Sequence, residues 1–202
     1  MILILIGHNG AGKSTLINYI LGFYTSISQH PFLKHFLNEI KPLDNSTVGY
    51  APEAAMLDLQ MSAKDYYKLM ASLRNVKQHN IVTELKRVKL DVDINMPLRK
   101  YSKGMKQRFL LALALMGKPE VVILDEPTSG LDPYGQKVVE DLLLELKDEF
   151  EFIICTHSMK LAYELDDEIW ILREGKIVLK ERFETLEALE LKVKEFQPER
   201  IQ

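Results

Sequence analysis

The stretch ILILIGHNGAGKSTLINYI, residues 2–20, decides the fold class of this chain. Its first five residues form an unbroken aliphatic run, which predicts a buried strand, and KSTLINYILG predicts the helix that follows. Between them, the glycine-rich loop GHNGAGKST has the pattern by which backbone N–H groups and a helix N-terminus surround phosphate oxygens. A glycine-rich turn that matches by chance is the alternative, and the flanking strand and helix count against it.

The loop assigns a first set of candidate residues. Its glycines let consecutive N–H groups turn toward a β-phosphate. Lys13 is expected to reach the β and γ phosphates of a nucleotide, and the Ser14 hydroxyl to coordinate Mg²⁺. The nucleotide-binding candidates within the loop are Gly7, His8, Asn9, Gly10, Ala11, Gly12, Lys13, Ser14 and Thr15.

Further along, strand and helix patterns alternate. VVILD (121–125) and EFIICT (151–156) read as buried strands, and the helical patterns SKGMKQRFLLALALMG and DPYGQKVVEDLLLELKDE precede and follow the first of them. This alternation predicts an α/β fold with a parallel sheet. IWILREGKIVLK predicts a hairpin, and residues 184–196 a closing helix.

The middle of the chain has a different character. SAKDYYKLMASL begins with a capping box at Ser62 and Asp65, and NIVTELKRVKL has apolar residues at helical spacing. We therefore expect one domain over residues 1–202, with its core at 1–52 and 118–202 and a helical subdomain at about 53–117.

Composition and charge count against several classes of protein. The 202 residues are 47% hydrophobic and 27% charged with a net charge of −3, and Lys and Arg are interleaved with Asp and Glu, so no nucleic-acid partner is expected. MILILI is too short for a signal peptide, and no stretch reaches the roughly 18 to 20 apolar residues of a membrane span. One cysteine, Cys155, forms no internal disulfide, which fits the cytoplasm.

Two adjacent carboxylates end the predicted strand at 121–125. In VVILDEPTSGLDP, Asp125 and Glu126 should point to opposite sides of the strand and so serve different purposes. Asp125 is the candidate Mg²⁺ ligand, and Glu126 the candidate for orienting or deprotonating the attacking water. Solvated acids before a proline turn are the alternative.

His157 follows the strand at 151–156 and is expected at the same sheet edge. Its imidazole would donate a hydrogen bond to a γ-phosphate and hold the water in line. A structural histidine is the alternative. Together these residues predict an Mg²⁺-dependent nucleotide hydrolase.

In this order, GHNGAGKST, YSKGMKQRFLLALAL, VVILDEPTSGLDP and CTHS resemble the nucleotide-binding subunit of an ABC transporter, from residue 2 to about 180. YSKGM (101–105) resembles the family's signature motif, which implies that Ser102 and the Gly104 backbone bind the γ-phosphate of an ATP held by a second copy. A plain helix cap at Ser102 is the alternative. The resemblance implies a P-loop fold with a helical subdomain, and a head-to-tail homodimer or heterodimer with two ATP molecules between subunits.

Two further segments carry the resemblance. SGLD (129–132) resembles the loop that touches the opposite subunit, with Asp132 its usual carboxylate, although Asp132 also suits a helix N-cap. In VGYAPE, Glu53 stands where many members carry a glutamine that couples nucleotide to the membrane partner; a solvated loop acid is the alternative. The YxPE form and YSKGM resemble exporter-type members.

The sequence departs from the family pattern at the residue that would stack on the adenine base. Members usually carry an upstream aromatic residue that stacks on the base, whereas few residues precede the loop here, so the antiparallel β-subdomain is expected to be reduced. Loss of stacking, about 1 to 3 kcal/mol per base elsewhere, implies weak discrimination between ATP and GTP. Phe23 and Tyr24 are substitutes, although both are expected in the core.

The resulting hypothesis is an ATPase subunit on the cytoplasmic face of the membrane that uses ATP and Mg²⁺ and drives a separate transmembrane permease, in the direction of export. A soluble ABC ATPase that works without a permease is one alternative. A slow ATP-dependent clamp is another, and Glu126 argues against it because a clamp needs no catalytic acid.

Overall fold

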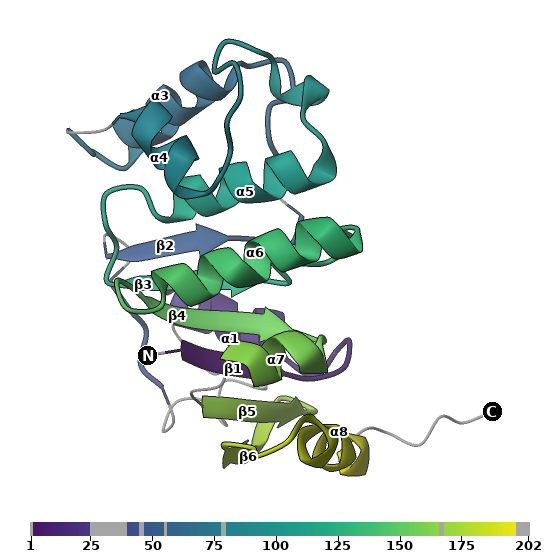
Figure 1. The fold of residues 1–202 in the computed structure, drawn as a ribbon. Helices are drawn as coiled ribbons and strands as arrows, with labels where there is room; N and C mark the ends of the chain where they lie inside the picture. Colours follow the sequence, from purple (N-terminus) through teal and green to yellow (C-terminus); the bar gives the residue numbers. More distant parts are fainter. Residues whose placement is uncertain are drawn as a thin grey trace. The chain divides into compact units, whose positions relative to one another are not determined.

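The computed structural model describes residues 2–24, 40–44, 47–54, 56–77, 80–165 and 168–196 (Figure 1). The chain divides into two compact units: unit 1 consists of residues 1–45 and 152–202, and unit 2 of residues 46–151. Each unit contains parallel strands with helices packed on them, which is the α/β arrangement expected from the alternating pattern. The proposed division into a core and a helical subdomain stays a prediction.

The strands of unit 1 form a mostly parallel sheet around β1 (Ile2–Ile6). β1 pairs in parallel with β4 (Glu151–Thr156) on one side and β5 (Glu168–Arg173) on the other. All five residues of β1 are buried, which explains why its sequence is aliphatic throughout instead of alternating.

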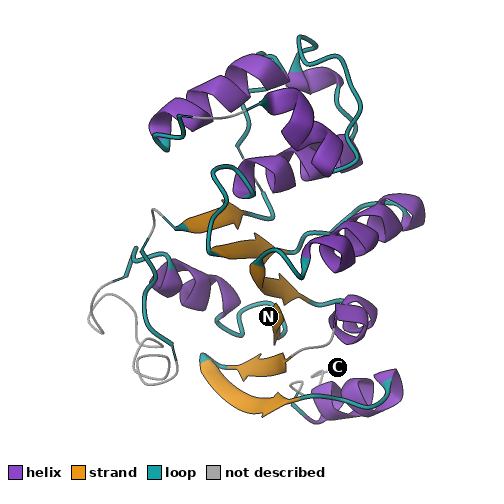
Figure 2. Ribbon diagram, turned by 60° about the vertical axis from the view of Figure 1, so that its left-hand side comes forward, coloured by secondary structure: helices purple, strands orange, loops and turns teal. Residues whose placement is uncertain are grey.

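Three helices and a hairpin complete the described elements of unit 1. In unit 1, α1 (Lys13–Ile20) and α7 (Met159–Leu165) lie on opposite sides of the strands (Figure 2), and α8 (Leu186–Glu195) packs on α7. β5 pairs antiparallel with β6 (Lys176–Glu181). The turn between them has left-handed φ angles of 51° at Glu174 and 73° at Gly175, as a tight hairpin requires, and the expected hairpin is confirmed.

Unit 2 contains a parallel strand pair, β2 (Val48–Ala51) and β3 (Val121–Asp125). α5 (Lys103–Ala114) packs on β2 and also contacts α3 (Ala63–Leu73) and α4 (Ile81–Arg87). α6 (Pro133–Leu146) follows β3, and a short 3₁₀ helix, η2 (Leu98–Lys100), precedes α5.

Arg74 ties three elements of unit 2 together. It caps the C-terminal end of α3 and donates hydrogen bonds to the carbonyls of Val48, at 2.7 Å, and Leu113, at 2.9 Å. Burial lowers the pKa of the guanidinium, yet a guanidinium stays charged, and its donors satisfy carbonyls at the start of β2 and the end of α5. This side chain therefore fixes α3 on the strand that leads to Glu53.

Sequence patterns predicted most of these elements. β1, β3 and β4 have the expected bounds, and the helix start at Ser62 is confirmed because its hydroxyl accepts from the Asp65 N–H. The patterns missed β2 and α7. Gly49 lies inside β2, and a Cβ there would come within 1.9 Å of the Ala114 carbonyl oxygen, so the close approach of α5 requires a residue that weakens the strand pattern.

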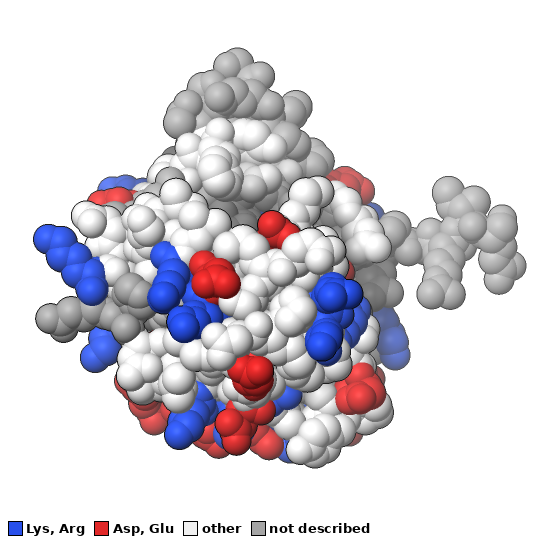
Figure 3. All heavy atoms as spheres, turned by 90° about the horizontal axis from the view of Figure 1, so that it is seen from above, with Lys and Arg blue, Asp and Glu red and all other residues white. Residues whose placement is uncertain are grey.

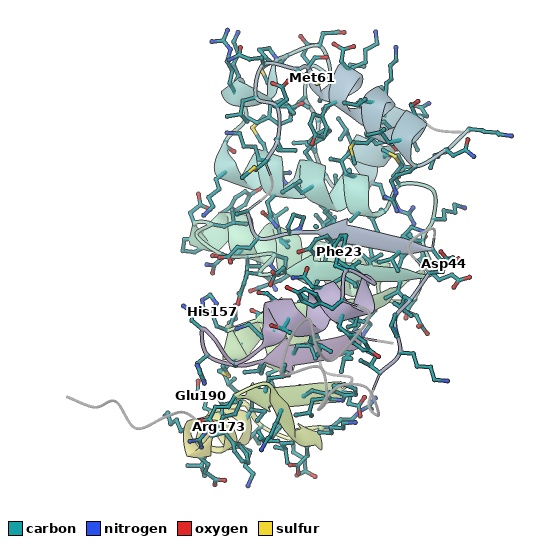
Figure 4. The ribbon with its side chains drawn as sticks, turned by 180° about the vertical axis from the view of Figure 1, so that it is seen from behind. Phe23, Asp44, Met61, His157, Arg173 and Glu190 are labelled. Carbon is teal, nitrogen blue, oxygen red and sulfur yellow. The ribbon has the colours of Figure 1, made fainter. Side chains whose placement is uncertain are left out.

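The expectation that Phe23 lies in the core is wrong. Its side chain is 65% exposed, just beyond the C-terminal end of α1, while Tyr24 is half-buried. Phe23 also lies far from His157 in Figure 4. The phosphate loop enters α1 at the opposite end, so eight helical residues, about 12 Å at ~1.5 Å per residue, separate Phe23 from it. Most of the segment after α1, residues 25–39, lies outside the described residues.

Candidate functional site

The phosphate loop of unit 1 is shaped by its glycines. Gly10 and Gly12 have φ angles of 84° and 106°, in the left-handed region that glycine adopts without strain. A Cβ on Gly7 would lie 2.8 Å from the Ala11 Cβ and 2.8 Å from the Leu172 carbonyl oxygen. The loop can therefore close tightly before α1 only with glycine at these positions.

Lys13 reaches back over this loop. Its Nζ donates to the Gly7 carbonyl at 2.5 Å and lies 3.4 Å from the His8 carbonyl, so the ammonium sits inside the turn of the loop. Ser14 follows it with an exposed side chain in the first turn of α1. A cation and a hydroxyl beside a helix N-terminus are suited to bind phosphate oxygens.

His157 lies beside the start of the phosphate loop. The parallel register pairs Ile6 of β1 with Thr156 of β4, and the next residues are Gly7 and His157. Neighbouring strands lie about 4.8 Å apart, so both residues leave the same sheet edge side by side. Sequence reasoning expected this placement from strand order, and the register of unit 1 shows it.

In unit 2, β3 ends at the two adjacent carboxylates. Asp125 is half-buried, whereas Glu126 is only 8% exposed. Glu126 has a φ of 50°, a left-handed conformation that costs a non-glycine residue about 1 to 2 kcal/mol. Strain of this kind persists where surrounding contacts enforce it, and it is concentrated at functional sites.

Glu53 lies at the same end of the β2–β3 pair. Ala51 of β2 pairs with Leu124 of β3, so Glu53 and the two acids of β3 follow their strands at one edge. The Oε1 atom of Glu53 accepts a hydrogen bond from Ser129 Oγ at 3.2 Å. Glu53 therefore has a defined partner in the loop after β3, which sequence reasoning did not foresee.

The SGLD residues join that loop to α6. Ser129 N–H donates to the Glu126 carbonyl at 3.1 Å, which folds the loop back on the acid. Asp132 is the N-cap of α6, and its Oδ1 accepts from the Gly135 N–H at 2.6 Å. Asp132 therefore caps α6 in the structure, and its contact with a second subunit stays a prediction.

The YSKGM segment begins α5. Ser102 is the N-cap, and its hydroxyl accepts from the Met105 N–H at 3.2 Å. The preceding Tyr101 is buried and stacks edge-on against Phe109 at 6.2 Å. Burial, and then the charge of Asp93, raises the pKa of Tyr101, so its phenol stays neutral at physiological pH. Gly104, in the first turn, has open space where a Cβ would lie.

The candidate residues thus fall into two groups. Unit 1 brings together the phosphate loop and His157, and unit 2 brings together Glu53, the acids of β3 and the SGLD loop, with the signature segment beginning α5. Lys103, the first residue of α5, lies over Gly130 of the SGLD loop, a contact that sequence reasoning did not foresee.

A metal requirement can be tested against these residues. Within the described ranges, no group of three or more His, Cys, Asp or Glu side chains is placed to hold a metal ion. Mg²⁺ at nucleotide sites usually takes one or two protein ligands together with phosphate oxygens and water, so no such cluster is needed. The hydroxyl of Ser14 and the carboxylate of Asp125 are oxygen donors of the type Mg²⁺ prefers.

A glycine-rich phosphate loop between a parallel strand and a helix, with acids at another strand end, defines a P-loop nucleotide-binding protein. Comparisons with known proteins identify the family within this class. The family model described as ABC transporter matches residues 1–129. The chain therefore belongs to the ABC transporter family, as an ATP-binding subunit that hydrolyses ATP.

Curated relatives agree with this family. The chain is 33% identical over 187 residues to the lantibiotic transport ATP-binding protein SrtF of Streptococcus pyogenes, which covers 92% of this chain and 81% of that protein. It is 34% identical over 177 residues to the zinc import ATP-binding protein ZnuC of Photorhabdus laumondii, covering 86% of this chain and 64% of that protein.

Solved structures share the fold. An ATP-binding subunit of an ABC transporter superposes with a TM-score of 0.74 at 23% identity, covering 96% of this chain and 88% of that one. A dimeric ATP-binding cassette in a post-hydrolysis state with ADP and phosphate has a TM-score of 0.71 at 19% identity, covering 91% and 86%. The predicted fold class is confirmed.

Proposed function

We propose that this subunit binds ATP with Mg²⁺, dimerises head to tail on ATP, and drives a separate transmembrane permease in the direction of export. Lys13 and the phosphate loop hold the phosphates, Ser14 and Asp125 coordinate Mg²⁺, Glu126 activates the water, and His157 orients it against the γ-phosphate. Ser102 and Gly104 contact the ATP of the second copy, and Asp132 and Glu53 transmit its state. The transported compound is set by the permease.

The conformation of Glu126 carries the hydrolytic part of this proposal. A buried glutamate at a strained backbone position is costly. The strain is explained if the carboxylate must face the reacting water at the sheet edge where such folds bind ligands.

The exposed apolar residues of unit 2 support a membrane partner. Met56 and Leu59, in the segment between Glu53 and Lys68, are exposed, as is Leu69 in α3. Figure 3 views the molecule from above and shows Lys and Arg interspersed with Asp and Glu among many uncharged residues. No helix of the described part is both long and apolar enough to cross a membrane. We place the permease contact at residues 53–68, on the cytoplasmic face.

The test compares two acids at opposite ends of β3. Glu126→Gln should keep ATP binding, lose nearly all turnover and accumulate an ATP-bound dimer, whereas Glu120→Gln, before the strand, should behave as wild type. Equilibrium ATP binding, phosphate release and sedimentation measure the three properties. Unchanged turnover in Glu126→Gln would overturn the assigned role.

A second experiment addresses the partner. The tagged protein is isolated from its native cells in mild detergent, and bound proteins are identified by mass spectrometry. A stoichiometric multi-span membrane protein supports the transporter subunit. Recovery alone, or with cytosolic proteins only, would favour the permease-free ATPase.

A further inference from the structure

A cavity of about 570 Å³ lies in unit 2, at the end of the β2–β3 pair opposite to the acids. Its walls are the residues at the end of α3 (74–77), Glu84 of α4, and residues 116–119, which lead from α5 into β3. The five residues of β3, about 16 Å at ~3.3 Å per residue, separate this cavity from the sheet edge with the acids. The cavity is therefore distinct from the candidate nucleotide residues, and its volume suits a small ligand.

Four charged side chains line this cavity. They are Arg74, Lys77, Lys118 and Glu84. Within the described ranges, no ion pair joins any two of them. The guanidinium of Arg74 donates to the carbonyls of Val48 and Leu113 and keeps further N–H groups that can donate elsewhere. The cavity therefore combines an excess of positive charge with one carboxylate.

Glu84 is the lining residue whose hydrogen bonding is incomplete. Its Oε2 atom is buried and accepts no hydrogen bond from the described residues. Helix dipoles account for the signs of the lining charges, because Glu84 lies in the first turn of α4 and the lysines follow the C-terminal ends of α3 and α5. A dipole supplies no donor, however, and a buried acceptor without a donor destabilises a fold. The carboxylate is therefore suited to accept from a donor that a ligand brings.

Tyr67 indicates that the two signs of charge act at one place. This tyrosine of α3 is buried, and burial followed by the charge of Glu84 raises its pKa to about 12, while the charge of Arg74 opposes the shift. The carboxylate and the guanidinium thus lie near the same phenol without forming an ion pair in the described part of the chain. A simple anion would be repelled by Glu84, and a simple cation by the three basic side chains.

We propose that this cavity binds a small zwitterion with more carboxylate than ammonium groups, of which an acidic α-amino acid is the simplest class. Its carboxylates accept from the guanidinium of Arg74 and the ammonium groups of Lys77 and Lys118, and its ammonium donates to Glu84. The excess of basic over acidic lining residues sets this ratio of charges. The site goes beyond the proposed ATPase and does not depend on it.

The experiment is a calorimetric titration of the whole chain without nucleotide. It compares L-glutamate with glutarate, which has both carboxylates but no ammonium, and with n-butylamine, which has only the ammonium. We expect the wild type to bind glutamate about tenfold more tightly than glutarate, the scale of one charge-assisted hydrogen bond, and not to bind butylamine. In Glu84→Gln the preference for glutamate over glutarate should disappear, because the amide carries no charge to pair with the ammonium.

Matched variants test the basic side of the cavity. Lys77→Ala and Lys118→Ala should each weaken binding of both glutamate and glutarate by about three- to tenfold and reduce its salt dependence. Lys68→Ala removes an exposed cation of α3 that does not line the cavity, and it should bind as the wild type does. The Tm of each variant, measured alongside, should stay within a few degrees of the wild type, so that weaker binding is not a sign of unfolding.

Three outcomes would overturn the proposal. Glutamate that does not saturate the wild type by about 10 mM shows that there is no such site. Equal affinities for glutamate and glutarate in the wild type show that the ligand is not a zwitterion, and this contrast needs no variant to fold. Losses in Lys68→Ala equal to those in Lys77→Ala show that binding is to general surface charge. Because no nucleotide is present, none of these failures bears on ATP hydrolysis, which the Glu126→Gln experiment tests separately.

Discussion

The phosphate loop of unit 1 and the SGLD loop of unit 2 are shaped by different means. The first is a backbone structure, in which Gly7 has no room for a side chain and Gly12 has a left-handed φ. The second combines backbone hydrogen bonds of its own, such as Ser129 N–H to the Glu126 carbonyl, with a side-chain contact from a distant segment, Glu53 on Ser129. The comparison teaches that the phosphate loop is shaped by glycine backbone packed closely against the distant Leu172, whereas the SGLD loop also takes a side-chain partner from another segment.

The largest effect is expected from Gly7→Ala. The new Cβ would collide with the Leu172 carbonyl, which is backbone and cannot move freely. We expect the free energy of unfolding to fall by about 1 to 3 kcal/mol, as it does when a core is overpacked. ATP turnover should fall about 100-fold because the loop is displaced. Denaturant unfolding and a phosphate-release assay measure both.

The matched control is Gly104→Ala, in the first turn of α5. A Cβ there meets nothing within 4 Å, so alanine should stabilise the helix by up to about 1 kcal/mol. Equal stabilities for the two variants would contradict the claim that backbone packing shapes the phosphate loop.

The next effect tests the strain at Glu126 by comparing two variants that both lose the carboxylate. Glu126→Gly should be more stable than Glu126→Ala by about 1 to 2 kcal/mol, because only glycine adopts a φ of 50° without strain. Both should lack turnover. Thermal and denaturant unfolding give the difference, and a more stable alanine variant would show that the residue is unstrained.

A smaller effect is expected at Asp132. Replacing it with alanine removes the N-cap of α6 and should cost about 1 kcal/mol of unfolding free energy. Asp132→Asn keeps an oxygen acceptor and should restore most of that stability. If turnover also recovers fully in Asp132→Asn, the capping role suffices and the carboxylate has no separate role at a subunit contact.

The smallest effect concerns the Glu53–Ser129 hydrogen bond. A double-mutant cycle with Glu53→Ala and Ser129→Ala should give a coupling free energy of about 0.5 to 1 kcal/mol. This is the lower part of the range for a protein hydrogen bond, because the pair is solvent-exposed. Glu53→Gln keeps an oxygen that can accept from Ser129 and serves as the control. A coupling of zero would mean that the SGLD loop keeps its position without Glu53.

Sequence reasoning succeeded where local chemistry is sufficient. The strands at 2–6, 121–125 and 151–156 are long aliphatic runs, and the capped start at Ser62 follows from residues three apart. It failed at β2, whose four residues include a glycine required by the approach of α5, and at Phe23, which is exposed despite being aromatic. For β2 the deciding neighbour, Ala114, is far away in the chain.

The sequence by itself determined the class of this protein, because the phosphate loop, the strand before it and the helix after it are one continuous segment whose glycines fix the backbone. It also indicated the acids and His157, since each directly follows an aliphatic strand. Only the tertiary structure decided that Ser129 bonds to Glu53, that Glu126 is strained and buried, and that Lys103 lies over Gly130. Those contacts join residues up to 76 positions apart, and no local pattern encodes which distant side chains will meet.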